Sequence, residues 1–242
     1  MRTTLEYDGV QVPIKVKQER RNNIRYSITG KSVNVLIPKG IIGTTVLEEV
    51  EKAKIWCKKE FDKKPHLLNR FRVIVYTNGE FLHVFGKDFK LLIFEEARKG
   101  LTGKMVRDEY IEVRVPQGAD QHQVQEAIGK LLSRVFSSFF HKDIVKRVMY
   151  YNNKYFQEDI VSIKLKNNQS NWGSCSTKKN INLSSRLLFA PLDVLDYVIV
   201  HELSHLKEMN HSARFWKIVH DVMPNYKEKE DWLTKYGHTL RY

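Results

Sequence analysis

Three histidines and a glutamate near the carboxy terminus have the types and spacing of a metal centre. His201 and His205 are four residues apart, so on an α-helix they lie on one face, one turn from each other. Two imidazoles in this arrangement can bind one Zn²⁺, and the adjacent Glu202 can act as a base on a water molecule held by that metal. His211 follows after enough residues for the chain to turn back and supply a third nitrogen. Three protein ligands with one open position are typical of a catalytic zinc site.

The residues around this H-E-x-x-H motif predict the helix that the motif requires. Pro191 suits a first helical position, and Asp193 places negative charge in the first turn, where the helix dipole favours it. Val194 and Val198 continue the helical spacing toward His201. The alternative is a buried amphipathic helix whose histidines only form hydrogen bonds, and the complete motif favours the metal site.

The segment after this helix must turn the chain so that His211 can reach the metal. Metzincin-type sites place glycine seven residues after the first histidine, but this chain has Glu208 there. We therefore expect Asn210 to adopt the left-handed conformation that a turn of this kind needs. Ser212 is predicted to cap a second helix that ends near Pro224.

A carboxylate further along the chain is the alternative third ligand. Glu228 and Glu230 are the candidates, as in gluzincin-like sites. The spacing favours His211, because it matches the metzincin pattern without further assumptions about the fold.

The segment from Ser170 to Tyr226 resembles the YgjP-like zinc metallopeptidases, which are relatives of the SprT-like proteases. The elements that carry this resemblance are Trp172-Gly173-Ser174-Cys175-Ser176, Ile181-Asn182-Leu183, Leu188, Pro191, the run Asp196 to Leu206, His211-Ser212 and Phe215-Trp216. The resemblance implies a Zn²⁺-dependent peptidase in which His201, His205 and His211 are ligands and Glu202 is the catalytic base. Asn171 and Ser184 depart from the family pattern, which often has arginine and asparagine there, and this bears on substrate contacts.

The fold class expected is α+β, with a zincin-like metallopeptidase domain preceded by a β-rich amino-terminal region. The boundary is placed near residue 118, which divides the chain into residues 1–117 and 118–242. Strands are predicted at residues 12–16, 24–28, 33–37, 71–76, 81–84, 89–94, 110–115, 161–165, 171–176 and 181–188, with a turn at Gly30-Lys31. Helices are predicted from a Thr45–Glu48 capping box to Phe61, at 121–140 and at 143–156. No internal repeat is visible in the sequence.

The strand that precedes the metal helix is expected to border the active-site cleft. If its edge is exposed, Asn182, Leu183 and Ser184 can bind an extended peptide substrate by strand addition. The alternative is a core strand that is paired on both sides.

Cysteine and tryptophan near the motif are interpreted as packing residues. The chain has two cysteines, Cys57 and Cys175, too few for a disulfide framework or a cysteine-based zinc knuckle. A thiolate at Cys175 could be a ligand or an inhibitory switch, but a free cysteine in an apolar strand is more often buried. Trp172 is expected to pack under the metal helix.

The sequence is strongly basic, with a net charge of +13 from 41 basic and 28 acidic residues. The excess is spread over both parts of the chain: residues 1–117 hold 23 basic and 15 acidic residues. Nucleic acid is therefore a candidate partner beside a polypeptide substrate. No apolar run is long enough to cross a membrane, and the first residues lack a signal-peptide core, so a cytoplasmic location is expected.

Two other classes of function remain as alternatives to a peptidase. A basic nucleic-acid-associated protein with a structural zinc, or a protease of DNA-bound proteins, would account for the charge. A scaffold with a degenerate metal site is the other alternative, although all three ligands and the base are present.

Overall fold

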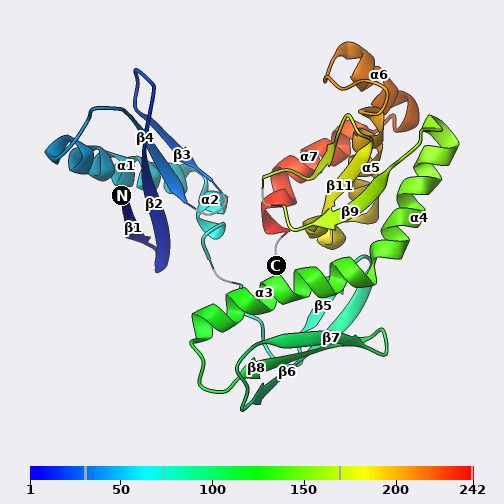
Figure 1. Cartoon of the computed structure of the whole chain (residues 1–242), viewed down its shortest axis with the longest axis horizontal. Coiled ribbons are helices and arrows are strands. Elements are labelled where there is room, and N and C mark those ends of the chain that lie inside the picture. The colour runs from blue at the N-terminus through cyan, green and yellow to red at the C-terminus, as the bar shows by residue number, and fades with distance from the viewer. Residues whose placement is uncertain (30–31, 73, 169, 241) are drawn as a thin grey trace. The chain divides into compact units, whose positions relative to one another are not determined.

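The computed structural model describes residues 1–29, 32–72, 74–168, 170–240 and 242 (Figure 1). Its internal contacts divide the chain into two compact units, Met1–Val73 and Ile74–Tyr242. The predicted boundary near residue 118 differs from this division. The reason is that the strands between residues 81 and 116 share a hydrophobic core with the helix that follows them, through contacts such as Phe89 with Phe136 (ring centroids 5.3 Å apart).

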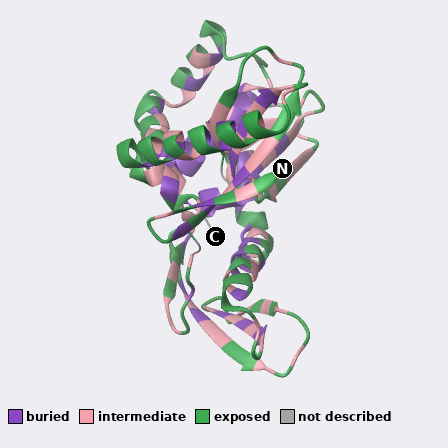
Figure 2. Ribbon diagram, turned by 90° about the vertical axis from the view of Figure 1, so that its left-hand side faces the viewer, coloured by how far each residue is buried: buried purple, intermediate pink, exposed green. Residues whose placement is uncertain are grey.

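The first unit is a four-stranded sheet covered by one long helix. Its elements are β1 (Arg2–Tyr7), β2 (Val10–Glu19), β3 (Arg25–Ile28), β4 (Val33–Pro38), α1 (Thr44–Lys63) and α2 (Pro65–Asn69). The strand order is β1-β2-β4-β3, in which β2 and β4 are parallel and the outer pairs antiparallel. Alternate residues of β2 and β4 are buried against Ala53, Cys57 and Phe61 of α1, so this unit has a core of its own (Figure 2).

The second unit begins with a similar sheet and continues into a smaller sheet packed on helices. Its elements are β5 (Phe81–Val84), β6 (Lys87–Glu96), β7 (Thr102–Val106), β8 (Tyr110–Pro116), α3 (Gln121–Phe139), α4 (His141–Tyr151), the π-helix η1 (Asn152–Phe156), β9 (Ser162–Lys166), β10 (Gly173–Cys175), β11 (Asn180–Ser184), the 3₁₀ helix η2 (Ser185–Phe189), α5 (Leu192–Ser204), α6 (Ala213–Val222), α7 (Tyr226–Tyr236) and the 3₁₀ turn η3 (Gly237–Thr239). Mixed helices and strands of this kind confirm the α+β prediction.

The two four-stranded sheets repeat one topology. The second has the order β5-β6-β8-β7, again with a parallel inner pair and antiparallel outer pairs, and each sheet is followed by a long helix, α1 or α3. No repeat is visible in the sequence, because what the two modules share is strand order and alternating burial, which many residue combinations satisfy.

Most predicted strands and helices are confirmed, and three predictions are wrong. No described residue of the predicted strand 71–76 is in a strand; the backbone N–H and C=O of Tyr76 bond instead to the side-chain amide of Gln125 on α3. The Thr45–Glu48 capping box does not form, because α1 begins after Gly43 without a side-chain cap.

The third error concerns the predicted strand 181–188. It ends at Ser184 and continues as η2, where Arg186 turns inward and donates hydrogen bonds to the carbonyls of Gly237 and Leu240. The strands β1 and β7 were not predicted. The predicted Gly30-Lys31 turn lies outside the described residues. Within the described ranges, no helix combines the length and apolar character needed to cross a membrane.

Candidate active site

The helix α5 carries the first half of the site and is the most deeply buried helix near it. Asp193 lies in its first turn, as predicted, whereas Pro191 is the N-cap residue, one position before the helical position predicted for it. Ten of its residues are buried, including Val194, Val198 and Glu202, because it packs between the small sheet and α7 (Figure 1). The helix ends at Ser204, so His205 is the first residue after the last full turn.

The structure brings the three predicted histidine ligands together. One ligand atom from each of His201, His205 and His211 lies within 4.8 Å of the others. The Nε2 atoms of His201 and His211 are 3.1 Å apart, close to the separation of about 3.4 Å for two nitrogens bound to one tetrahedral Zn²⁺. Among the described residues, Glu228 and Glu230 are not part of this group. The donor set therefore fits a zinc ion, whose fourth position would be left to a non-protein ligand.

The turn after α5 brings His211 to this group without a left-handed residue. Asn210 does not have a positive φ, so its predicted conformation is wrong. Instead, the N–H groups of Lys207 and Glu208 both bond to the carbonyl of Ser204, which tightens the end of the helix. The Ser212 prediction is confirmed: its hydroxyl accepts a hydrogen bond from the N–H of Phe215 and caps α6.

The environment of His201 and His205 keeps these two imidazoles neutral. Nδ1 of His205 donates to the carbonyl of Glu208 at 3.2 Å, which leaves Nε2 of the same ring with a free lone pair. Burial lowers the pKa of His201 to about 3, and the neighbouring His205 and His211 add to this effect. Burial also lowers the pKa of His205. Neutral imidazole is the form that binds a metal ion, so little proton competition is expected at these two rings.

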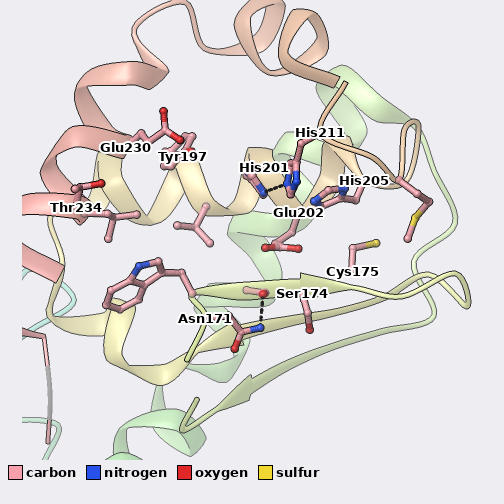
Figure 3. Close-up of a pocket in the computed structure, with 15 residues that line it drawn as sticks. Asn171, Ser174, Cys175, Tyr197, His201, Glu202, His205, His211, Glu230 and Thr234 are labelled. Carbon is pink, nitrogen blue, oxygen red and sulfur yellow. Dashed lines mark hydrogen bonds between the residues drawn. The ribbon is translucent and has the colours of Figure 1, made fainter. Parts of the chain in front are cut away.

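Glu202 lies beside the histidines with its side chain turned toward the small sheet (Figure 3). It is 5% exposed, and its Oε2 atom has no hydrogen-bond partner among the described residues. Burial raises the pKa of this carboxyl to about 8 in the metal-free protein. A buried acid with an unpartnered oxygen next to a metal-binding group can exchange a proton with a reacting molecule.

A cleft of about 620 Å³ runs along α5 and contains the histidines and Glu202 (Figure 3). The strand β10 forms one wall and α7 contributes Glu230, Leu233 and Thr234. Leu233 and Thr234 were not predicted to line the cleft, because nothing in the sequence indicates that α7 returns to it.

The substrate-binding prediction for Asn182, Leu183 and Ser184 is wrong as far as strand addition is concerned. Their strand β11 is the middle strand of the order β10-β11-β9 and is paired on both sides, so it has no free edge. Leu183 and Ser184 are also fully buried. The edge strand that borders the cleft is β10, which contains the Gly173-Ser174-Cys175 part of the family motif.

Cys175 in β10 and Trp172, which directly precedes this strand, have roles close to those predicted. Cys175 packs against the hydrophobic core and lies outside the metal-binding group, and burial together with nearby Glu202 raises its thiol pKa to about 11. Trp172 packs against the core and under the guanidinium of Arg186, 4.1 Å from the ring centroid, but it also lines the cleft.

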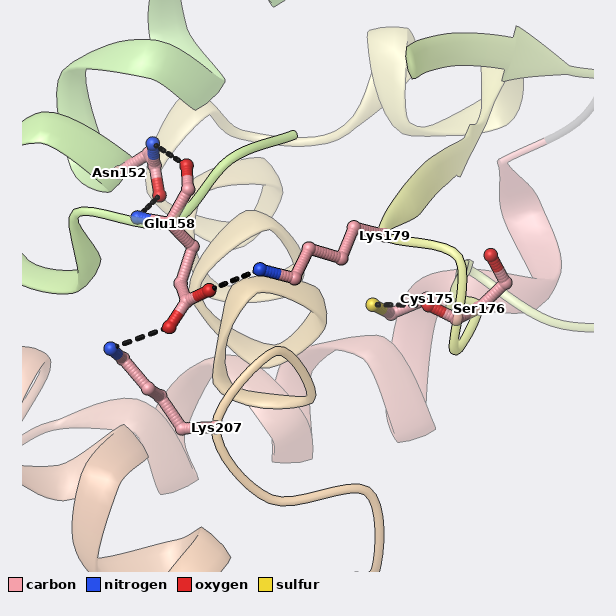
Figure 4. Close-up of polar contacts among 6 residues, drawn as sticks. All are labelled: Asn152, Glu158, Cys175, Ser176, Lys179 and Lys207. Carbon is pink, nitrogen blue, oxygen red and sulfur yellow. Dashed lines mark hydrogen bonds and ion pairs between the residues drawn. The ribbon is translucent and has the colours of Figure 1, made fainter. Parts of the chain in front are cut away.

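Glu158, which does not line the cleft, forms ion pairs with two segments close to the cleft. Glu158 accepts from Lys179 (2.8 Å), in the turn between β10 and β11, and from Lys207 (2.7 Å), in the loop after α5 (Figure 4). The buried side chain of Asn152 bonds to both the N–H and the C=O of Glu158 and holds its backbone in place. The two lysines lower the pKa of Glu158 to about 2. No sequence signal pointed to this residue.

Comparison with known proteins agrees with the motif. The family model described as YgjP-like, metallopeptidase domain, matches residues 22–236. A curated relative, the UTP pyrophosphatase of Escherichia coli (strain K12), is 27% identical over 95 residues, which is 38% of this chain and 57% of that protein. The chain thus aligns with a little over half the length of this relative.

Two solved structures are also similar over part of the chain. The metallopeptidase zymogen abylysin of Pyrococcus abyssi has a TM-score of 0.35 and 26% identity, covering 38% of this chain and 93% of its own. The zymogen jannalysin of Methanocaldococcus jannaschii has a TM-score of 0.33 and 27% identity, covering 39% and 93%. Since the family model spans most of the sequence, including the histidine motif and both walls of the cleft, this chain belongs to the YgjP-like metallopeptidase family.

Proposed function

We propose that this protein is a zinc-dependent peptidase in which His201, His205 and His211 hold the metal and Glu202 is the general base. The observation that carries the proposal is the position of Glu202: a buried carboxylate with one unpartnered oxygen, directly beside three imidazoles that share a centre. A bound Zn²⁺ would supply Lewis acidity, lowering the pKa of water and polarising a substrate carbonyl.

The residues of the chain perform the proton transfers in this reaction. The Glu202 carboxylate takes a proton from the attacking water and then delivers it to the leaving amine, which would otherwise be expelled as an unstable anion. Burial of Glu202 favours the proton-carrying form and so strengthens the carboxylate as the proton acceptor in the first transfer. The adjacent dication would favour the ionised form, so both protonation states are accessible near neutral pH.

An extended peptide can be placed in the cleft by adding to the free edge of β10. This strand borders the cleft, and no described strand pairs with its outer side. Main-chain hydrogen bonds to such an edge give affinity with little dependence on sequence. The substrate's carbonyl would then lie between the edge strand and the three histidines.

A second candidate function is hydrolysis of a nucleoside triphosphate, because the curated relative is named a UTP pyrophosphatase. The lining of the cleft argues for the peptidase. A triphosphate is normally bound by Lys, Arg and backbone N–H groups, and no Lys or Arg is among the described residues that line the cleft, whereas Glu202 and Glu230 are.

Glu202→Gln tests the proposal, since it removes the base and keeps the shape of the side chain. We expect the variant to bind one zinc per chain, measured by atomic emission, and to lose at least a thousandfold in kcat on an unfolded protein substrate. Parallel assays with UTP separate the two candidates. Cleavage of UTP but of no polypeptide by the wild type, or full proteolysis by the variant, would refute the proposal.

A further inference from the structure

The charges that line the cleft differ from those of the rest of the chain. The sequence has 41 basic and 28 acidic residues, yet the described lining residues include two carboxylates and neither lysine nor arginine. Glu202 is accounted for as the base. The second carboxylate, Glu230, has no part in the proposed chemistry and lies outside the metal-binding group.

Glu230 is a partly buried carboxylate without a counter-charge. No basic side chain of the described residues forms an ion pair with it, although the preceding residues Glu228 and Lys229 are paired. Lys229, the adjacent residue, bonds to Asp193 at 2.7 Å and is therefore engaged elsewhere. A carboxylate that lines the cleft and has no basic partner among the described residues can bind a cation supplied from outside the chain.

The cleft that contains Glu230 and the histidines is lined mainly by apolar surface. Trp172, Val198 and Leu233 are among its lining residues, and so is Tyr197. Figure 3 shows Glu230, Tyr197 and Thr234 at the end of the cleft opposite Cys175, with the histidines between. Apolar walls that end in a carboxylate match a ligand with an aliphatic stem and a positively charged head.

We propose that Glu230 determines specificity by binding a cationic group of the substrate. The group is the side chain of a lysine or arginine near the scissile bond, or the free α-ammonium of a peptide. That the ligand is a polypeptide rests on the proposed peptidase function. The test measures binding and does not depend on turnover.

Peptide binding to zinc-loaded, full-length Glu202→Gln protein provides the first test. Three short amidated peptides are compared by calorimetry: one acetylated with lysine at its centre, one acetylated with uncharged norleucine there, and one with norleucine and a free amino terminus. We expect the lysine peptide or the free-amino peptide to bind about tenfold more tightly than the acetylated norleucine peptide. Which of the two binds tightly identifies the source of the cation.

Variants on α7 connect this selectivity to one side chain. Adding Glu230→Gln to the Glu202→Gln background should reduce the selectivity ratio to about one. Glu228→Gln is the matched control, because Glu228 is on the same helix, is exposed and does not line the cleft; the ratio should stay near ten.

Several outcomes would overturn the inference. Equal binding of the three peptides, no binding of any, or a selectivity that survives Glu230→Gln would each do so. If the selectivity is present and depends on Glu230 but the wild type cleaves no peptide, the cation subsite stands and the proposed peptidase function fails. In a wild type that cleaves peptides, Glu230→Lys should shift the preference in kcat/KM from lysine toward glutamate at the same position.

Discussion

Gly173 lies directly against the side chain of Glu202, and a larger residue at position 173 would collide with this side chain. A Cβ atom built on Gly173 would be 2.6 Å from Cγ of Glu202 and 2.7 Å from its Cδ. The glycine of the Trp-Gly-Ser-Cys motif therefore provides the space in which the proposed base lies. This explains in physical terms why edge strand β10 and helix α5 can approach so closely.

Gly173→Ala is predicted to displace Glu202 and reduce activity without removing the metal. Since the carboxylate must move by a few tenths of an ångström or more, we expect kcat to fall about a hundredfold or more, while zinc content remains one per chain. Gly100→Ala is the control, because a Cβ at Gly100 meets no atom within 4 Å. Wild-type kcat in Gly173→Ala would show that the position of Glu202 is not critical.

His205→Ala is predicted to reduce both metal content and stability. Two histidines remain, and a zinc site with one fewer ligand binds its ion far more weakly. We expect less than one zinc per chain after dialysis and a lower thermal midpoint. Excess chelator should lower the midpoint of the wild type toward that of the variant. His220→Ala, at an exposed position of α6 outside the metal group, serves as control. Equal metal retention in both variants would contradict the ligand assignment.

The stability of the metal-free protein is predicted to fall with rising pH because of Glu202. Its pKa is raised by burial from 4.5 to about 8, so between these values the folded state binds a proton that the unfolded state has lost. The free energy of unfolding then decreases as pH rises, by up to about 1.4 kcal/mol per pH unit. Glu202→Gln cannot lose this proton. In chelator, the variant should gain stability relative to wild type from pH 5 to pH 8, and an unchanged difference would argue against the buried acid.

Glu158 is predicted to stabilise the fold through its two lysine partners. Its pKa is lowered to about 2 by Lys179 and then Lys207, so its stabilising effect is complete above the unfolded value of 4.5 and is lost as pH falls toward 2. Because both lysines are partly exposed, Glu158→Gln should cost only about 1–2 kcal/mol at pH 7.

The surface pair of Glu126 with Lys130 (3.6 Å) provides the control for this prediction. Glu126→Gln should change the free energy of unfolding by less than about 0.5 kcal/mol. Urea unfolding of both variants at pH 7 and pH 3 measures the difference. If Glu158→Gln changes the free energy of unfolding at pH 7 as little as Glu126→Gln does, the ion pairs of Glu158 do not contribute to stability.

Local patterns were sufficient to predict most of the secondary structure. The sequence pattern predicted strands such as β2 and β8, and helical spacing predicted α5. The predictions failed where the hydrogen bonds of the backbone are made to a residue distant in sequence. Tyr76 bonds to Gln125, 49 residues away, so its segment has no need of a neighbouring strand.

The proposed metal ligands and base could be identified from sequence because they depend on residue type and on the spacing of one helix and the turn after it. His201, Glu202, His205 and His211 lie within eleven residues, where the geometry of the helix determines which side chains meet. The tertiary structure alone decided which strand has the free edge, that Gly173 makes room for Glu202, and that Glu230 reaches the cleft. These features depend on how separate elements pack, and packing is set by the shapes of surfaces that no local pattern encodes.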